Sequence, residues 1–242
     1  MSERAGARLD GHSVVITGAG RAGQLAEVVA REFASKGARV SLVARTMGDA
    51  EARVADLRRA ALDAAPFACD LADPAATADV ARRIALAGGE PVHALIHLAG
   101  GFAMSGPVVE SDPAVFRRML EINLATAYGA ARAFLPSLRT ARGALVFVAS
   151  LAALPGGRAA GMSAYAAAKA GLIALMRAIA QEERERGVRS NALAPSAIRT
   201  AANLASMGDK VRYVERESVA DVIVFLCSDA ARNVTGQVIE LA

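Results

Sequence analysis

Apolar and polar positions alternate along the 242-residue chain in two patterns. Short, nearly continuous apolar runs are typical of strands that are buried on both faces of a parallel sheet. Longer segments repeat apolar residues every three or four positions, which is the period of an amphipathic helix. We therefore predict strands at 13–17, 39–44, 67–69, 92–97, 144–149, 188–194 and 237–241.

Turn and cap residues place helices between these strands. Gly37 follows the first helical segment, as glycine commonly does at a helix end, and Asp73 before Pro74 is a typical helix start. We predict helices that end near Lys36, that begin near Asp73, and that cover 49–62, 113–138 and 162–186.

This alternation, without a linker-like stretch, predicts one domain over residues 1–242. We expect a doubly wound, Rossmann-like α/β fold whose seven-stranded parallel sheet is flanked by helices on both faces. Residues 1–10 are expected to form a flexible N-terminus.

Composition and charge narrow the possible functions. Apolar residues make up 54% of the chain, enough for a large core, and the net charge is +4. Basic and acidic residues are interspersed, as in 181–186, which favours a solvated surface over a nucleic-acid site. Cys69 and Cys227 lie far apart in apolar runs and indicate neither a disulfide nor a metal site. We find no signal-like N-terminus, predict no membrane-spanning stretch, and expect a cytoplasmic protein.

Tyr165 and Lys169 form the most informative chemical pair. Positions i and i+4 share one face of a helix. A phenol has an ordinary pKa of about 10, and a fixed positive charge beside it would lower that pKa toward the range of a useful proton donor and acceptor. An exposed helix could carry the same two residues by coincidence. Other residues must therefore show whether the pair is catalytic.

A glycine-containing turn follows the first predicted strand. Gly18, Gly20 and Gly23 allow tight backbone turns, and the amides at the start of the next helix favour an anion such as a pyrophosphate. A dinucleotide-binding fold often carries an acid after its second strand, but here Arg45 stands in that place. Arg45, with Arg21 on the glycine turn, suits a 2′-phosphate and favours NADP(H) over NAD(H).

Asp70 ends the third predicted strand. Its carboxylate is placed to bind an adenine amine, but it could equally cap its own loop.

Further motifs follow in order along the chain. They are His97-Leu-Ala-Gly-Gly101, Asn123 within Glu-Ile-Asn-Leu, Ser150 after a strand, 191–200, 225–229 and 234–237. Together with the glycine turn and the Tyr165/Lys169 pair, they make the chain from about residue 11 to 240 resemble the short-chain dehydrogenase/reductase family of the Tyr-x-x-x-Lys type.

The resemblance implies a role for each matching residue. Tyr165 would exchange a proton with the substrate oxygen, Lys169 would lower the tyrosine pKa and hold the nicotinamide ribose, and Ser150 would hydrogen-bond the carbonyl. Asn123 would hold a water that links Lys169 to solvent. The remaining cofactor-binding positions that it implies are Ala99, Gly100, Pro195, Ile198 and Thr200.

Three departures from the family pattern concern the cofactor more than the reaction. Gln24 and Ala26 stand where the usual Thr-Gly-x-x-x-Gly-x-Gly loop has its last two glycines, and the loop has two extra residues. His97 and Leu98 replace the usual Asn, and we interpret His97 as structural rather than catalytic. Ser196, instead of glycine, follows Pro195, and Ser150 and Tyr165 are slightly further apart than usual.

The sequence thus predicts an NADP(H)-dependent carbonyl reductase or alcohol dehydrogenase. The alternatives are a cofactor-binding sensor or scaffold without turnover, and a dehydratase, isomerase or cyclase on the same fold. Leu151, Leu154, Met162 and Met207 suggest an apolar small-molecule substrate, with 198–213 as its lid. By resemblance we expect a homodimer or homotetramer that pairs through the helices 113–138 and 162–186.

Overall fold

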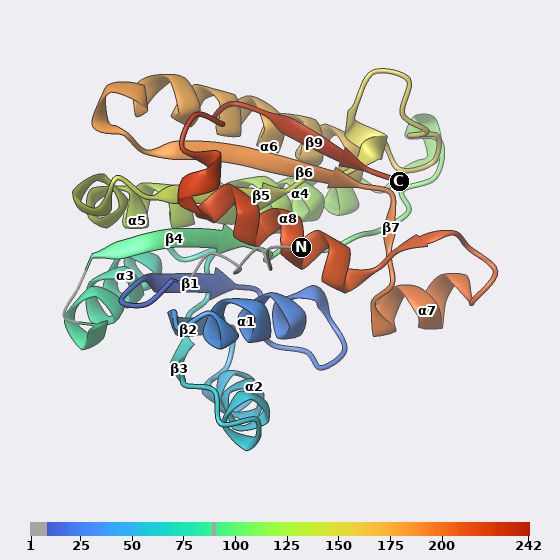
Figure 1. Cartoon of the computed structure of the whole chain (residues 1–242). Coiled ribbons are helices and arrows are strands. Elements are labelled where there is room, and N and C mark those ends of the chain that lie inside the picture. The colour runs from blue at the N-terminus through green and yellow to red at the C-terminus, as the bar shows by residue number, and fades with distance from the viewer. Residues whose placement is uncertain (1–8, 89–90) are drawn as a thin grey trace, which may run out of the picture.

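A computed structural model describes residues 9–88 and 91–242 of the chain (Figure 1). Its central sheet has seven parallel strands in the order β3-β2-β1-β4-β5-β6-β9. The strands are β1 (Ser13–Thr17), β2 (Arg39–Ala44), β3 (Ala64–Ala68), β4 (Val92–His97), β5 (Ala144–Val148), β6 (Arg189–Pro195) and β9 (Val238–Leu241). The predicted doubly wound fold with a seven-stranded parallel sheet is confirmed.

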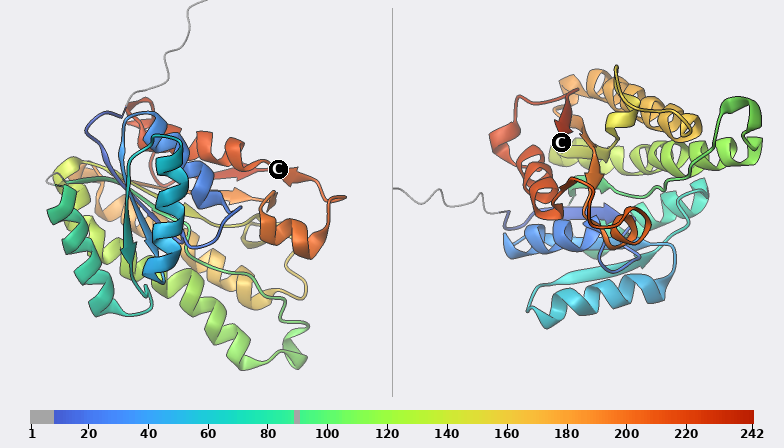
Figure 2. Two further views of the ribbon diagram at one scale, coloured as in Figure 1. Left: turned by 90° about the horizontal axis from the view of Figure 1, so that it is seen from below. Right: turned by 90° about the vertical axis from the view of Figure 1, so that its right-hand side faces the viewer.

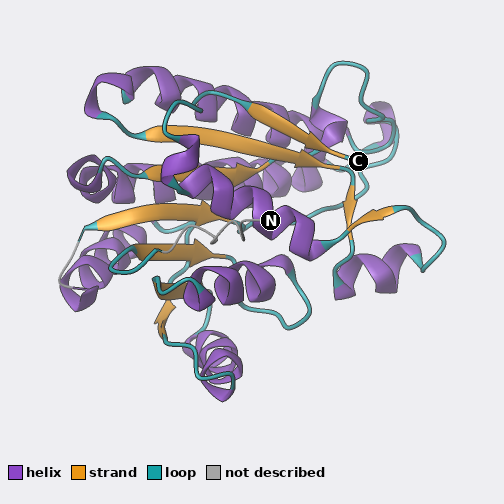
Figure 3. Ribbon diagram, viewed as in Figure 1, coloured by secondary structure: helices purple, strands orange, loops and turns teal. Residues whose placement is uncertain are grey.

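Helices cover both faces of this sheet, as Figure 3 shows in purple around orange strands. The helices are α1 (Leu25–Ser35), α2 (Met47–Arg59), α3 (Pro74–Gly88), α4 (Pro113–Leu120), α5 (Thr126–Ala141), α6 (Ser163–Glu182), α7 (Ala201–Met207) and α8 (Arg216–Cys227). Alternate side chains of a strand point to opposite faces. Val14 and Ile16 accordingly pack with α1, α2 and α8, whereas Val15 packs with α3, α5 and α6.

The strand order reverses beside β1, which pairs with β2 on one side and with β4 on the other. Loops that leave these strands at their carboxyl ends diverge to opposite faces, and open sheets of this kind bind ligands at such a point. Figure 1 shows the strand arrowheads pointing to the right, toward α7, and the right-hand view of Figure 2 looks onto this edge. The glycine turn after β1 and Ser150 after β5 both lie at this edge.

The predicted third strand and two predicted helices need correction. The predicted third strand 67–69 is instead Ala64–Ala68 and includes Pro66. Proline is tolerated there because β3 is an edge strand, with no partner beyond it in the sheet. The predicted continuous helix 113–138 is broken by a π-helical turn at Glu121–Ala125 and runs on to Ala141.

The second predicted helix, 49–62, begins earlier, at Met47, and ends at Arg59. Thr46 caps it, because its hydroxyl accepts a hydrogen bond from the amide of Asp49 at 3.2 Å. The chain turns back at Ala61, which has a left-handed backbone with φ 56°.

Residues 1–8 of the predicted flexible N-terminus lie outside the described part of the chain. Within the described part, Leu9 is buried and its amide donates to the carbonyl of Lys36 at 2.8 Å, and the flexibility of the segment stays a prediction. The prediction that no stretch could span a membrane also needs correction. Among the described residues, α6 is long and apolar enough to cross a membrane. However, Leu172 and Met176 on this helix are buried in the core against the sheet.

The segment 198–213, predicted as a lid, contains α7 and joins two short paired strands, β7 (Ala197–Ile198) and β8 (Tyr213–Val214). The Tyr213 hydroxyl donates to the carbonyl of Gly208 at 2.6 Å, and the Asn203 amide donates to the carbonyl of Ile198 at 2.8 Å. These bonds make the segment a folded unit beside the glycine turn, and its movement as a lid stays a prediction.

Candidate active site

Lys169 lies one turn after Tyr165 on α6, on the same face of the helix. The side chain is buried, and its Nζ donates a hydrogen bond to the carbonyl of Val148, at the end of β5, over 2.7 Å. Burial lowers the pKa of Lys169 to about 8, because the low-polarity surroundings disfavour the ammonium form.

The Tyr165 side chain extends from α6 toward Ser150, which lies two residues beyond the end of β5. Burial raises the pKa of the Tyr165 phenol, and its hydrogen bond with Ser150 lowers that pKa in part. The net direction is upward, and the expected lowering by Lys169 stays a prediction. The Lys169 Nζ lies 5.8 Å from the centre of the tyrosine ring and donates to the Val148 carbonyl. Ser150 favours the phenolate, but burial outweighs it.

The Ser150 hydroxyl also accepts a hydrogen bond from the amide of Ala152 at 3.3 Å. It thereby caps the short 3₁₀ helix Leu151–Ala153, which holds Ser150 at the edge of the sheet. The capping role and a contact with Tyr165 are therefore compatible.

Asn123 is fully buried in the π turn between α4 and α5. Its Nδ2 donates to the carbonyl of Gly101 at 2.9 Å, and its Oδ1 accepts from the amide of Gly101 at 3.2 Å. Gly100 lies against the side-chain amide of Asn123, because a Cβ at this glycine would come within 2.6 Å of the Asn123 Oδ1 and 3.6 Å of the Lys169 Nζ. Asn123 thus fixes the backbone that runs past Lys169, and its predicted water link stays a prediction.

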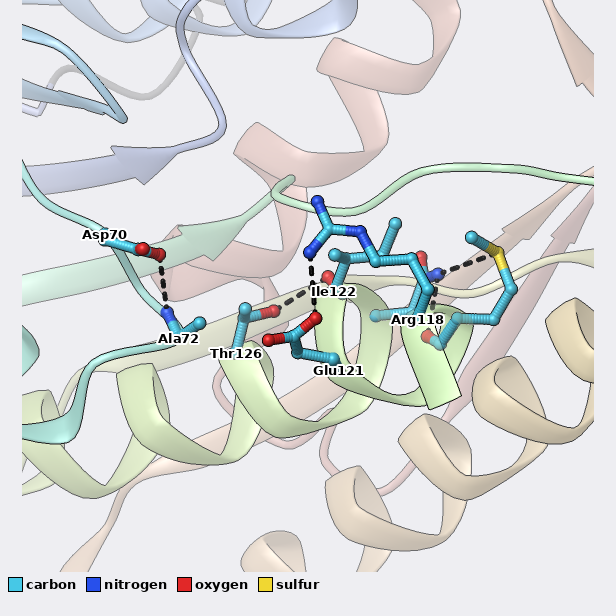
Figure 4. Close-up of polar contacts among 8 residues, drawn as sticks. Asp70, Ala72, Arg118, Glu121, Ile122 and Thr126 are labelled. Carbon is cyan, nitrogen blue, oxygen red and sulfur yellow. Dashed lines mark hydrogen bonds and ion pairs between the residues drawn. The ribbon is translucent and has the colours of Figure 1, made fainter. Parts of the chain in front are cut away.

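Figure 4 shows the polar contacts around this π turn. The Thr126 hydroxyl donates to the carbonyl of Ile122 at 2.8 Å, and Arg118 pairs with Glu121. These bonds hold the chain on either side of Asn123. π turns of this kind occur frequently at functional sites.

His97 ends β4 close by, fully buried. Its Nδ1 lies 3.0 Å from the Thr17 hydroxyl and its Nε2 lies 3.4 Å from the Thr126 hydroxyl. Because Thr126 donates to Ile122, it accepts from Nε2, and Nδ1 accepts from Thr17. Burial lowers the pKa of His97 to about 3, so the ring is neutral. These contacts support its interpretation as a structural residue that joins β1, β4 and α5.

The glycine turn lies directly beside the end of β4. Gly18 has a left-handed backbone with φ 76°, and a Cβ there would come within 2.6 Å of the Ala99 amide nitrogen. Only glycine can make this approach. The turn leads to α1, whose N-cap residue Gln24 forms no side-chain cap within the described structure.

The two extra residues of this turn carry it toward α7. The Gly23 carbonyl accepts a hydrogen bond from the amide of Ala201 at 2.9 Å, and its amide donates to the Glu27 carboxylate at 2.8 Å. The turn is therefore tied to the predicted lid, and one of its amides is already bound to an anionic side chain. The sequence analysis missed Glu27, although an acid in the first turn of a helix is a recognisable signal.

Arg21 and Arg45 are exposed at the same end of the sheet, after β1 and β2. Asp49, which the sequence analysis also missed, lies near them. Its carboxylate accepts from the Thr46 hydroxyl at 2.7 Å and would lie 3.8 Å from a Cβ at Gly20. The spacing Thr46-x-x-Asp49 resembles a capping box and could have revealed this acid.

Asp70 follows Cys69 beyond β3, and its carboxylate accepts from the amide of Ala72 at 3.0 Å (Figure 4). One carboxylate oxygen of Asp70 therefore caps its own loop, the alternative to binding an adenine amine. At the other side of the site, Pro195 ends β6, Ile198 lies in β7, and the Thr200 hydroxyl caps α7 by accepting from the amide of Asn203 at 3.2 Å.

These residues fit a nicotinamide dinucleotide at the carboxyl edge of the sheet. A Cβ at Gly18 would collide with the backbone of Ala99, and a Cβ at Gly100 would collide with the side chain of Asn123. Glycine at both positions therefore allows these segments to pack closely. Lys169, Tyr165 and Ser150 lie at one end of this edge, and Arg21 and Arg45 lie at the other. A nicotinamide at the first end and an adenosine at the second would match that order.

A family model described as enoyl-(acyl carrier protein) reductase matches residues 18–241. Curated relatives include galactitol 2-dehydrogenase (L-tagatose-forming) from Cereibacter sphaeroides, 33% identical over 99% of this chain and 96% of that protein. Protein FixR from Bradyrhizobium diazoefficiens is 36% identical over 70% of this chain and 66% of FixR.

A solved structure of 7α-hydroxysteroid dehydrogenase, complexed with NADH and 7-oxo glycochenodeoxycholic acid, is similar to the chain with a TM-score of 0.88. It is 28% identical, and the match covers 100% of this chain and 96% of that chain. The chain belongs to the short-chain dehydrogenase/reductase family. It is an oxidoreductase of that family, of the nicotinamide-dependent kind that acts on CH–OH and C=O groups.

We predict that Ser150→Ala raises the pKa of Tyr165 further, because it removes the hydrogen bond that lowers this pKa. The loss of one such bond to a phenolate corresponds to a rise of about one pH unit. The check is an ultraviolet absorbance titration of phenolate, with Tyr165→Phe as the reference that subtracts Tyr128 and Tyr213. An unchanged or lower midpoint in Ser150→Ala would show that this bond does not control the phenol.

Proposed function

We propose that the protein is an NADP(H)-dependent carbonyl reductase or alcohol dehydrogenase in which Tyr165 exchanges a proton with the substrate oxygen. One observation carries the proposal. The Ser150 hydroxyl lies close enough to the Tyr165 phenol to lower its pKa, and buried Lys169 lies on the same face of α6 as Tyr165, at the edge of the sheet where the glycine turn emerges. The family comparison supports the redox chemistry, and the residue roles are inferred from geometry.

The reaction follows from these positions. A substrate carbonyl oxygen accepts hydrogen bonds from the Ser150 and Tyr165 hydroxyls, which stabilise the negative charge that develops on it. The nicotinamide, when bound, supplies or accepts the hydride. Tyr165 protonates the oxygen in reduction and takes its proton in oxidation, and Lys169 replaces the phenolic proton. A lysine whose pKa is about 8 can exchange a proton near neutral pH, which suits this role.

Arg45 and Arg21 support NADP(H) as the preferred cofactor. Both are exposed at the end where a 2′-phosphate would lie, and a guanidinium binds a phosphate with two hydrogen bonds. The carboxylate of Asp49 opposes them, and the similar 7α-hydroxysteroid dehydrogenase structure is a complex with NADH. We propose that the two arginines outweigh the one carboxylate, which Thr46 already hydrogen-bonds.

The substrate is proposed to be an apolar ketone or secondary alcohol, because Leu151 and Leu154 lie partly exposed beside Ser150. We further propose that the protein is cytoplasmic and forms a homodimer or homotetramer through the surfaces of α4, α5 and α6. Tyr128 on α5 is 58% exposed and supports such a contact.

Turnover tests the proposal directly. The protein is mixed with NADPH and a panel of ketones, and the loss of reduced-nicotinamide absorbance is followed. Turnover of at least one ketone is expected. Tight NADPH binding without turnover of any ketone or alcohol would instead favour a sensor, or a dehydratase, isomerase or cyclase on this fold.

We predict that Tyr165→Phe lowers kcat at least a hundredfold, the scale of a lost general acid–base, while NADPH binding changes little. Phenylalanine keeps the ring packing and removes only the hydroxyl. Steady-state rates and fluorescence binding of NADPH measure the two effects separately. Retained activity would show that another group handles the proton.

We predict that Arg45→Ala weakens NADPH binding about tenfold, the scale of a charge-assisted bond, and NADH binding much less. Equilibrium fluorescence titration with each nucleotide measures this difference without turnover. Arg59→Ala, at the far end of α2, is the matched control and should change neither affinity.

Asp49→Asn should have the opposite effect and tighten NADPH more than NADH, because it removes a negative charge near the phosphate. Equal effects of Arg45→Ala on both nucleotides would remove the basis for an NADP preference.

A further inference from the structure

Two large apolar side chains lie exposed beside the candidate proton donor. Phe102 and Met104 are each 58% exposed, and both belong to the irregular segment 101–107 that follows β4. The edge of one ring faces the other in the pair Phe102–Tyr165, with ring centres 5.1 Å apart and planes at 83°. This edge-to-face geometry is a favourable aromatic contact.

Segment 101–107 is held in place against the start of α6. The amides of Ser105 and Gly106 both donate to the carbonyl of Gly161, at 2.8 and 3.0 Å. The Met104 side chain packs over the same glycine, because a Cβ at Gly161 would lie 3.0 Å from the Met104 Cε. Asn123 clamps the other end of the segment through Gly101. Phe102 is therefore fixed relative to Tyr165 by bonds at both ends of its segment.

The wall formed by Phe102 and Met104 offers no hydrogen-bonding side-chain group except the methionine sulfur, a weak acceptor. A substrate oxygen that reaches the Tyr165 hydroxyl brings the groups on its carbon close to this wall. Hydroxyl groups there would lose water without gaining a strong partner, which is unfavourable, whereas a flat apolar group would remove aromatic surface from water. The wall should therefore favour substrates with flat apolar groups on the reacting carbon over substrates with hydroxyl groups there.

We propose that Phe102 is a specificity-determining residue that contacts a ring of the substrate, so that the enzyme prefers cyclic or aryl ketones and alcohols to open-chain polyols. The inference rests on the proposed reaction at Tyr165 but adds the substrate class and the residue that selects it. It applies to this chain whatever substrates its relatives use.

The test compares wild type with Phe102→Ala and Phe102→Leu, using NADPH with an aryl methyl ketone, a bicyclic ketone and dihydroxyacetone. Wild type should have the higher kcat/KM for the two ring ketones. Phe102→Ala should raise KM for these about tenfold, the scale of a lost apolar contact, with little change in kcat and none for dihydroxyacetone. Phe102→Leu should restore only part of the affinity, because it keeps apolar volume but loses the flat ring.

Phe225→Ala is the matched control, since Phe225 is 43% exposed but belongs to α8, on the opposite face of the sheet from α6. It should leave all constants unchanged. Equal losses of Phe102→Ala for every ketone, no loss for the ring ketones, or a wild-type preference for dihydroxyacetone would overturn the proposal.

Failure of the proposed reaction is distinguishable from failure of this inference. If wild type turns over no substrate, calorimetric binding of the bicyclic ketone to the NADPH-saturated protein replaces the kinetic test. Weaker binding by Phe102→Ala than by wild type and Phe225→Ala would then support the role of Phe102. Equal affinity in all three proteins, or no binding by wild type, would contradict it.

Discussion

The buried ammonium group of Lys169 is the constraint on which the rest of the site depends. A charge removed from water is unfavourable unless nearby groups compensate, and the carbonyl of Val148 at the end of β5 supplies the compensating hydrogen bond. This bond fixes α6 against the sheet edge and places Tyr165 beside Ser150. The backbone past Lys169 is held in turn by Asn123, which leaves room for only a glycine at position 100.

The two ends of the site are positioned by different means. At the reacting end, β4, β5, the π turn and α6 hold side chains through bonds between buried groups. At the nucleotide end, exposed arginines and an exposed acid surround a turn with two extra residues. That turn is joined to α7 through the Gly23 carbonyl and to α1 through Glu27. Hydrogen bonds therefore fix the side chains at the reacting end. The preference for one cofactor, by contrast, depends on the balance of a few exposed charges at the nucleotide end.

The sequence predicts the fold well, because strands buried on both faces leave a clear pattern, and its i, i+4 pair lies on one face of α6 as expected. It does not reveal the π turn around Asn123, since the five residues Glu121–Ala125 are too few for their pattern to be told from that of the α-helices on either side. Nor does it reveal the direction of the Tyr165 pKa, because the burial of the phenol depends on segments far apart in the chain. The predicted third strand left out Pro66, which is tolerated because β3 lies at the edge of the sheet.

Unfolding free energies of wild type and Lys169→Met across pH test the central claim most directly. The pKa of Lys169 is about 8 in the folded chain against an ordinary 10.5, so the unfolded chain binds more protons between these values. Wild-type stability relative to the variant should therefore rise with pH through this window, by about 3 kcal/mol in total, and level off above it. A stability difference that does not change with pH would contradict the account.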